Sequence, residues 1–352
     1  MDVGTRPRIK DVARQAGVSE KTVSNVINDH PHVRPATRAA VEAAIDALGY
    51  RVNLAGRHLR RGRSGVIALV VPELDLGYFA ELADLVIREA ERLSRTVLVH
   101  QSEARREREE SALEGFGADF VDGVILSPLA MDDAALRTHP SRLPVVLLGE
   151  LPRTVRHGHV AIDNVAAARE ATEHLLDGGR TRIAVVGGRP PGPSGTAELR
   201  TRGYREALEA RGRSYDPELV RPAGHFHWRD GAELAAELVA GPRPPDALLC
   251  MNDLLALGAM RALHDAGVRV PRDVAVVGFD DIAPGRYSVP SLTTVAPDKP
   301  GLAREAVRLL LEEVEARRGA PDAEPGAGAD RASAKVVVGH TLLVRESSAS
   351  AL

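Results

Sequence analysis

The chain is poor in several residue types that mark particular classes of protein. Its 352 residues include one cysteine, Cys250, which excludes an internal disulfide framework and a zinc site built from several cysteines. Aromatic residues make up only 3% of the sequence, and only four of its 46 basic residues are lysines. No apolar run approaches the roughly 20 residues of a transmembrane helix, and the amino-terminal segment lacks the apolar core of a signal peptide. We therefore expect a cytoplasmic globular protein.

Charge is distributed unevenly along the sequence. The formal net charge is -3, yet residues 1–64 hold 12 basic and 6 acidic residues, whereas residues 65–352 hold 34 and 43. A basic segment favours contact with phosphates even when the total charge is negative. The length corresponds to two or three domains. We therefore expect a small basic domain, followed by a larger acidic one with a different task.

The basic segment has the apolar periodicity of three short helices. The pattern predicts one helix over residues 9–16, a second over 20–27 capped by Ser19, and a third that begins at Pro35. Gly17 separates the first two, as in a helix-turn-helix, in which the second helix enters the major groove of DNA. A plain three-helix bundle with a polar face fits the same periodicity. The side chains expected on the exposed face of the second helix are Glu20, Lys21, Thr22, Ser24 and Asn25.

The residues themselves favour the DNA-binding interpretation. The segments Ile9-Lys-Asp-Val-Ala-Arg-Gln-Ala-Gly-Val-Ser19, Thr22-Val-Ser-Asn-Val-Ile-Asn28 and Ala47-Leu-Gly-Tyr50 closely resemble the headpiece of the LacI/GalR family of bacterial transcription regulators. The resemblance implies a sequence-specific repressor that binds palindromic operator DNA as a homodimer. One departure is Arg8, which stands where the family usually has a threonine or serine cap. The expected DNA contacts are Lys10, Ser19, Glu20, Lys21, Thr22, Ser24, Asn25, Asn28, Asn53, Arg57 and Leu59.

Residues 51–64 form a basic segment, with five arginines among 14 residues. A flexible linker is one interpretation. The resemblance implies instead a hinge helix from Asn53 to about Leu59 that orders on DNA, with the leucine inserted into the minor groove to kink the duplex. Val52 and Gly56 replace the family's usual proline and alanine. Because glycine inside a helix costs about 0.5–1 kcal/mol relative to alanine, we expect this hinge to depend more on DNA and on the partner subunit.

The remainder of the chain alternates between strand and helix patterns. Short apolar runs of the buried parallel-strand type recur from residue 66 to residue 277, with helical patterns between them. Two such series predict an α/β fold of two doubly wound parallel-sheet lobes, similar to the family's periplasmic-binding-protein-like sensor. The last strand falls at 336–338 or 342–344, after a low-complexity insert at 319–334. The expected division is a helix-turn-helix domain over 1–50, a hinge over 51–64 and an effector-binding and dimerisation domain over 65–346. Within that domain we expect lobe 1 at about 65–161 and 293–320, lobe 2 at about 162–292 and 335–346, and crossings near 162, 292 and 320.

Ligands of such folds bind beyond the carboxyl ends of the strands, so we expect a small-molecule site in the cleft between the lobes. Loops after strands supply the aromatic and polar candidates Tyr78, Phe79, Asp163 and Asn252. The family resemblance adds Thr196, Arg200, Phe226 and Asp280. Asp253 suits a helix N-cap as well as a ligand contact, whereas Asp281 and Tyr204 are expected to support the site and the core. Donors, acceptors and aromatic faces together suit a sugar, with a purine or nucleoside as the alternative.

The sequence contains none of the common catalytic motifs. The phosphate loop, GxGxxG after a strand, GxSxG and HExxH are all missing, and His225 and His227 form a pair with no obvious metal partner. We therefore expect a regulator without enzymatic activity, cofactor or metal. A solute-binding protein would share the body but lack the basic head, and a nucleoid-type DNA-binding protein would need no ligand pocket.

Overall fold

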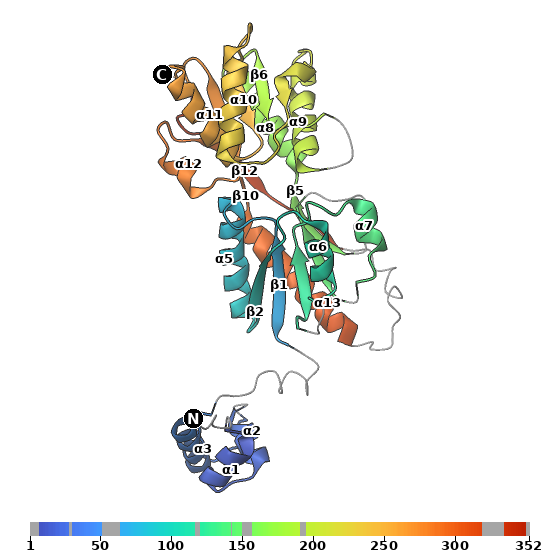
Figure 1. The fold of residues 1–352 in the computed structure, drawn as a ribbon, viewed down its shortest axis with the longest axis vertical. Coiled ribbons are helices and arrows are strands. Elements are labelled where there is room, and N and C mark those ends of the chain that lie inside the picture. The colour runs from blue at the N-terminus through green and yellow to red at the C-terminus, as the bar shows by residue number, and fades with distance from the viewer. Residues whose placement is uncertain are drawn as a thin grey trace, which may run out of the picture. The chain divides into compact units, whose positions relative to one another are not determined.

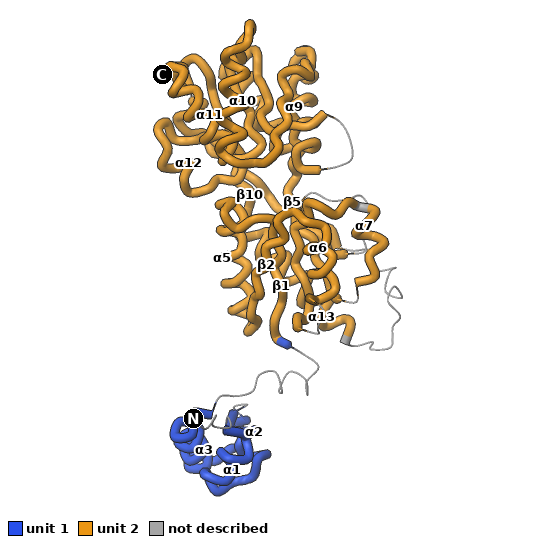
Figure 2. The backbone as a smooth tube through the Cα atoms, in the orientation of Figure 1, with its two compact units in different colours: residues 1–64 blue, residues 65–352 orange. Residues whose placement is uncertain are grey.

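The computed structural model describes residues 7–27, 30–50, 64–116, 120–141, 143–149, 157–190, 195–318 and 334–349. The chain forms two compact units, Met1–Ser64 and Gly65–Leu352 (Figure 2). The expected hinge helix, with Asn53, Arg57 and Leu59, lies outside the described residues, as do Asn28 and nearly all of the 319–334 insert. Within the described residues, no helix is both long and apolar enough to span a membrane.

The first unit consists of the three helices predicted from the sequence, α1 (Ile9–Ala16), α2 (Glu20–Ile27) and α3 (Pro35–Leu48). Gly17 ends α1 with φ 65°, a left-handed conformation that glycine adopts without a steric penalty. Ser19 Oγ accepts a hydrogen bond from the backbone N–H of Thr22 at 3.1 Å, so Ser19 caps α2 as expected. The small core comes from all three helices and centres on Val12, Val23, Val26, Val41 and Ala44.

The second unit contains two lobes, each built on a six-stranded sheet (Figure 1). Lobe 1 has the strand order β11-β5-β4-β3-β1-β2, and every pair in it is parallel. Its strands are β1 (Val66–Val71), β2 (Thr96–Gln101), β3 (Gly123–Leu126), β4 (Val145–Leu148), β5 (Gly158–Ile162) and β11 (Lys335–Val338). Its helices are α5 (Gly77–Arg92), α6 (Arg106–Leu113), α7 (Asp133–Thr138) and α13 (Lys299–Arg318).

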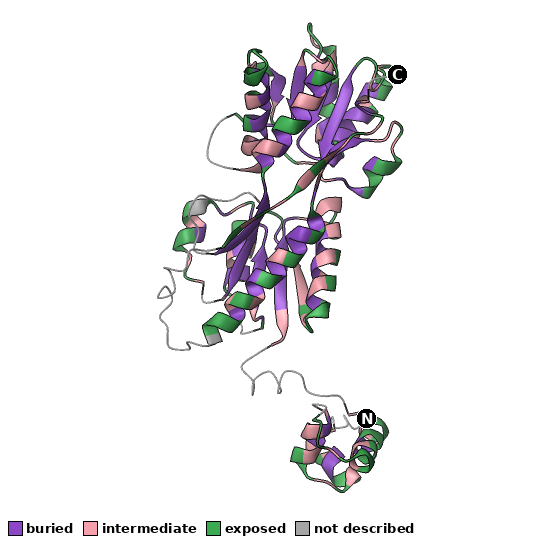
Figure 3. Ribbon diagram, turned by 180° about the vertical axis from the view of Figure 1, so that it is seen from behind, coloured by how far each residue is buried: buried purple, intermediate pink, exposed green. Residues whose placement is uncertain are grey.

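Both faces of the lobe 1 sheet are covered, which explains the continuous apolar runs in its strands (Figure 3). Successive side chains of a strand point to opposite faces. Ile67 and Leu69 of β1 accordingly belong to the cluster formed with α5 and α13, whereas Ala68 and Val70 belong to the cluster formed with α6 and α7. All four are fully buried. This is the doubly wound arrangement predicted from the sequence.

Lobe 2 has the strand order β12-β10-β9-β8-β6-β7, in which only β12 is antiparallel to its neighbour. Its strands are β6 (Ile183–Val186), β7 (Val220–Arg221), β8 (Ala247–Cys250), β9 (Ala275–Phe279), β10 (Thr293–Pro297) and β12 (His340–Leu343). Its helices are α8 (Asn164–Asp177), α9 (Thr196–Ala210), α10 (Trp228–Ala240), α11 (Asp253–Asp265) and α12 (Ala283–Tyr287), with a 3-10 turn at Pro217–Leu219.

Two of the three expected crossings between the lobes were wrong. The first lies after Ile162, as predicted, because β5 belongs to lobe 1 and α8 to lobe 2. However, β10 pairs with β9 in lobe 2, so the second crossing follows Pro297 instead of residue 292. β11 pairs with β5 and β12 with β10, so the third crossing is at Gly339 instead of residue 320. The ranges 293–320 for lobe 1 and 335–346 for lobe 2 therefore misassign β10 and β11. An apolar pattern identifies a strand but does not identify the strand with which it pairs.

Close helix packing fixes the entry to α10. A Cβ added at Gly258 of α11 would lie 1.9 Å from the carbonyl oxygen of Trp228, and one at Gly231 of α10 would lie 2.1 Å from that of Leu255. The two helices can approach this closely only because both positions lack a side chain. The packing sets the position of the loop 222–227, which leads into α10 and includes Phe226 and His227.

Candidate functional site

The helix α2 presents a polar face on the side opposite its buried stripe. Val23 and Val26 are buried in the head core, which turns Lys21 and Asn25 outward, one helical turn apart. Of the predicted DNA contacts, Lys10, Ser19, Glu20 and Lys21 are exposed, and Thr22, Ser24 and Asn25 are partly exposed. The first unit therefore offers a helix-turn-helix with donors and acceptors that can reach base edges in a major groove.

Arg8 precedes α1 and makes no side-chain cap, as expected for a residue whose side chain has no acceptor. The Asp11 carboxylate instead accepts a hydrogen bond from the backbone N–H of Arg8 at 2.9 Å. This contact satisfies one of the free donors at the helix start and places a negative charge at the positive end of the helix dipole. The departure from the family pattern at Arg8 is thus partly compensated by Asp11.

The guanidinium of Arg200 makes several polar contacts at the carboxyl ends of the strands. It lies on α9 and is 9% exposed. Its Nε donates to Asn164 Oδ1 at 2.6 Å, Nη1 donates to the carbonyl oxygen of Met251, and its Cζ lies 3.8 Å from the centre of the Phe279 ring. Nη2 lies 3.9 Å from Asp280 Oδ1. The ends of three strands, β5, β8 and β9, therefore converge on one cation, as expected for a ligand site in an α/β fold.

Asp280 follows β9 in a strained backbone conformation. Its φ of 103° is rare for a residue other than glycine, and strain of this kind concentrates at functional sites. Burial raises the pKa of the Asp280 carboxyl, and the nearby cations Arg200 and Lys299 counteract part of that rise. The side chain remains 14% exposed, so the carboxylate can accept hydrogen bonds from a bound molecule.

Asn252 and Asp253 start α11 but have different tasks. Asn252 is the N-cap, because its Oδ1 accepts from the backbone N–H of Leu255 at 2.9 Å, and its Nδ2 donates to the carbonyl oxygen of Phe226 at 2.9 Å. The interpretation of Asp253 as an N-cap was therefore wrong. Asp253 is fully buried and accepts hydrogen bonds from Thr294 Oγ1 and the backbone N–H of Ile282. Burial, reinforced by Asp280, raises its pKa.

The remaining predicted contacts differ in exposure and in what they pack against. Asp163 is exposed and caps α8 by accepting from the backbone N–H of Ala166 at 2.9 Å. Tyr78 and Phe79 lie in the first turn of α5, edge to face with ring centres 5.1 Å apart, and both pack against the lobe 1 core. Phe226 packs against the lobe 2 core, and Thr196, the first residue of α9, is partly exposed.

Asp281 and Tyr204 have the supporting roles that were predicted for them. The Asp281 carboxylate binds Arg286 at 2.5 Å and Arg345 at 2.6 Å; burial acts to raise its pKa, but these hydrogen bonds outweigh it and leave the pKa below its ordinary value. Tyr204 is 1% exposed and donates its hydroxyl to the carbonyl oxygen of Ile183 at 2.8 Å. Asp281 thus anchors the loop after β9, and Tyr204 belongs to the core.

A second group of charges joins the lobes directly. Glu81 of α5 accepts from the backbone N–H of Ala283 at 3.2 Å and from Lys299 Nζ, which also donates to the carbonyl oxygen of Asp281 at 3.2 Å. Lys299 stands where the chain crosses between lobes and is 7% exposed. Glu81 therefore links lobe 1 to the loop that positions Asp280.

Three residues of this region, Asn164, Glu81 and Lys299, were not among those predicted from the sequence. Asn164 directly follows Asp163 and is 2% exposed, so a polar residue placed immediately after a strand was the available signal. Lys299 is one of only four lysines in the chain, and that rarity was a second signal. Nothing in the sequence pattern marked Glu81, because it lies on a helix among other charged residues.

A helix-turn-helix unit followed by a two-lobed α/β body with a polar junction defines a ligand-responsive DNA-binding regulator. Residues 8–53 match the family described as bacterial regulatory proteins, lacI family, and residues 172–348 match the periplasmic binding protein-like domain. The HTH-type transcriptional regulator CelR of Thermobifida fusca is 37% identical over 321 residues, which cover 89% of this chain and 94% of CelR. The chain belongs to the LacI family of bacterial transcriptional regulators.

Solved structures agree with this assignment. The chain is similar to a crystal structure of the lac repressor dimer bound to operator and the anti-inducer ONPF, with 26% identity and a TM-score of 0.83 over 98% of this chain and 100% of that one. It is also similar to a complex of the transcriptional regulator CelR with cellobiose, with 33% identity and a TM-score of 0.69 over 97% of this chain and 100% of that one. Both the head and the two-lobed body therefore have counterparts in regulators of the same family.

Proposed function

We propose that this protein is a cytoplasmic homodimeric repressor whose affinity for a palindromic operator is controlled by a sugar bound between the two lobes. The proposed division is a DNA-binding head over 1–50, a hinge over 51–64 and an effector-binding and dimerisation body from residue 65. A two-fold dimer matches a palindromic site. We further propose that the protein has no catalytic activity of its own.

The observation that supports a sugar most strongly is the setting of Arg200. Its guanidinium is buried beside the Asp280 carboxylate and the Phe279 ring. Donors and acceptors side by side suit the hydroxyl groups of a sugar, each of which both donates and accepts. The similar CelR structure contains cellobiose, which makes this disaccharide the first compound to test.

The proposed control is a shift between two arrangements of the lobes. The effector favours one arrangement by binding it more tightly and so changes the population that can bind DNA. Linkage requires that DNA change the effector affinity by the same factor. In the head, Lys21 and Asn25 read base edges, and the arginines of head and hinge bind phosphates, which makes the affinity dependent on salt.

The test has two steps. Binding-site selection with the purified protein should return a palindrome, and its affinity should be measured with and without a panel of sugars and nucleosides. We expect a sugar to change operator affinity and to raise the melting temperature of the free protein. A response to nucleosides alone would favour the purine or nucleoside alternative, and a response to neither class would refute a sugar-controlled regulator.

A further inference from the structure

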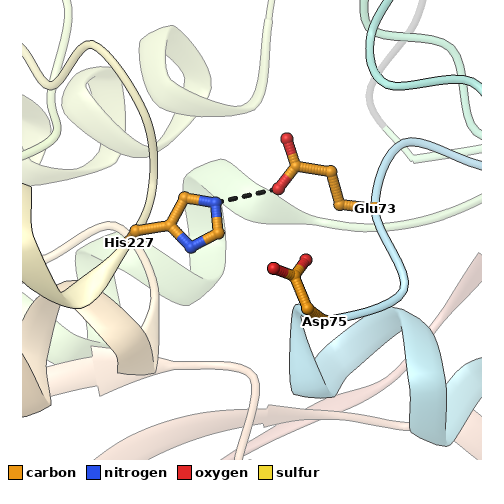
Figure 4. A group of neighbouring side chains, drawn as sticks. All are labelled: Glu73, Asp75 and His227. Atoms are coloured by element: carbon orange, nitrogen blue, oxygen red, sulfur yellow. Dashed lines mark hydrogen bonds and ion pairs between the residues drawn. The ribbon is translucent and has the colours of Figure 1, made fainter.

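Three metal-ligating side chains from the two lobes meet at one place. Glu73 and Asp75 lie in the loop after β1 in lobe 1, and His227 precedes α10 in lobe 2. One ligand atom from each lies within 4.8 Å of those of the other two, and they are the single such group of three or more in the described part of the chain. Figure 4 shows the carboxylates of Glu73 and Asp75 together on one side of the gap and the imidazole of His227 on the other.

Part of this group is already in contact across the lobes. His227 Nε2 lies 2.8 Å from Glu73 Oε2, with the side chains 36% and 29% exposed. Asp75, the third member of the group, is exposed, and its carboxylate makes no hydrogen bond or ion pair with any other described residue. A second carboxylate beside the first raises their mutual repulsion. A bound cation would remove that repulsion.

We propose that Glu73, Asp75 and His227 form a binding site for a divalent transition-metal cation that bridges the two lobes. One neutral imidazole and two carboxylates are ligands that zinc accepts, and their combined charge balances that of the metal. In a four-coordinate site with bonds of about 2.0–2.2 Å, ligand atoms lie about 3.4 Å apart. The three side chains can reach this spacing by rotating about their own bonds, since all three are at least partly exposed.

The cation would bind most tightly when the lobes hold the geometry seen here, since its ligands come from both. It would therefore favour that arrangement over any in which the loop after β1 and the start of α10 move apart. Three protein ligands leave one coordination position open. The group shares no residue with the contacts of Arg200, and its test does not depend on the effector being a sugar.

Zinc titration of the purified full-length protein, by calorimetry without effector or DNA, tests the proposal. We expect one site per chain, and a loss of affinity of at least about tenfold in His227→Ala and in Asp75→Asn. The Asp75→Asn variant is decisive because it leaves the hydrogen bond between Glu73 and His227 intact. His225→Ala is the matched control, since that exposed histidine lies two residues away and outside the group, and it should bind zinc like the unmodified protein. Magnesium, which prefers oxygen ligands in octahedral geometry, should not compete.

Each outcome decides the proposal. Loss of zinc affinity in both site variants but not in His225→Ala supports it, as does a zinc-dependent rise in melting temperature that the same two variants abolish. Absence of zinc binding by the unmodified protein would show that the group is only a hydrogen-bonded pair, Glu73 and His227, with the Asp75 carboxylate beside it. Equal zinc affinity in His227→Ala would place any binding at other histidines of the chain. Either result would overturn the site.

Discussion

Replacement of Arg200 by alanine should destabilise the body and abolish the effector response. The change removes the donor to Asn164 Oδ1 and to the carbonyl oxygen of Met251, and an acceptor that loses its partner in a buried site costs about 1–3 kcal/mol. It also removes the nearest cation from Asp280. Loss of one partner of a buried charged network typically costs about 3–5 kcal/mol in total, since the separate terms overlap. We expect a decrease of that size in the free energy of unfolding.

The effect should depend on pH in a defined direction. Burial places the folded-state pKa of Asp280 above its ordinary value, so the native state binds more protons and stability falls as pH rises through that pKa. Arg200 counteracts the rise, and its removal raises the pKa further. The deficit of Arg200→Ala should therefore be smaller under acidic conditions than at neutral pH.

Urea denaturation of the full chain, followed by fluorescence and circular dichroism at several pH values, measures the deficit. Arg205→Ala is the control, because Arg205 lies on the same helix in an exposed pair with Glu209 and should change stability little. Arg200→Lys keeps a charge near Asp280 and provides a milder variant for effector titration. Equal stability of Arg200→Ala and Arg205→Ala would refute the buried network, and normal effector titration in Arg200→Lys and Arg200→Ala would refute the ligand contact.

Three further predictions concern the head, the helix packing and the buried carboxyl. Asn25→Ala should relax the operator preference at one position by about 1–3 kcal/mol, and an unchanged site-selection profile would exclude a base contact. Gly258→Ala should cost about 1–3 kcal/mol or more, because its Cβ would lie 1.9 Å from the carbonyl oxygen of Trp228; Gly195→Ala, with open space at that position, is the control in the same melting assay. Asp253→Asn should flatten the fall in stability with rising pH, since burial raises the pKa of Asp253; a pH profile identical to that of the unmodified protein would contradict this.

Much of the fold could be predicted because its elements are short and strongly patterned. The strands 66–71, 123–126, 183–186 and 247–250 all fall on the short apolar runs that predicted them, since each is buried on both faces of its sheet. The small helices of the head were equally clear, because glycine, serine and proline mark their ends. Helix α7, a short element in a mixed segment, was not predicted.

The candidate site was predictable only in part. The family resemblance identified Arg200 and Asp280, which the structure brings within 3.9 Å of each other. It did not identify Asn164 and Lys299, which hold these groups in place, because their roles depend on burial. The position of Asn252 after a strand suggested a ligand contact, whereas both ends of that side chain already bind neighbouring backbone.

The sequence by itself determined the class of the protein, since the helix-turn-helix residues and the alternating apolar runs are local patterns. Tertiary structure alone decided how segments distant in the sequence meet. It assigned β11 and β12 to different lobes, because pairing depends on which sheet edge is open. It also brought Glu73 and Asp75 to His227, a histidine with no apparent metal partner in the sequence. Contacts across about 150 residues of chain follow from the packing of two lobes, which no local periodicity encodes.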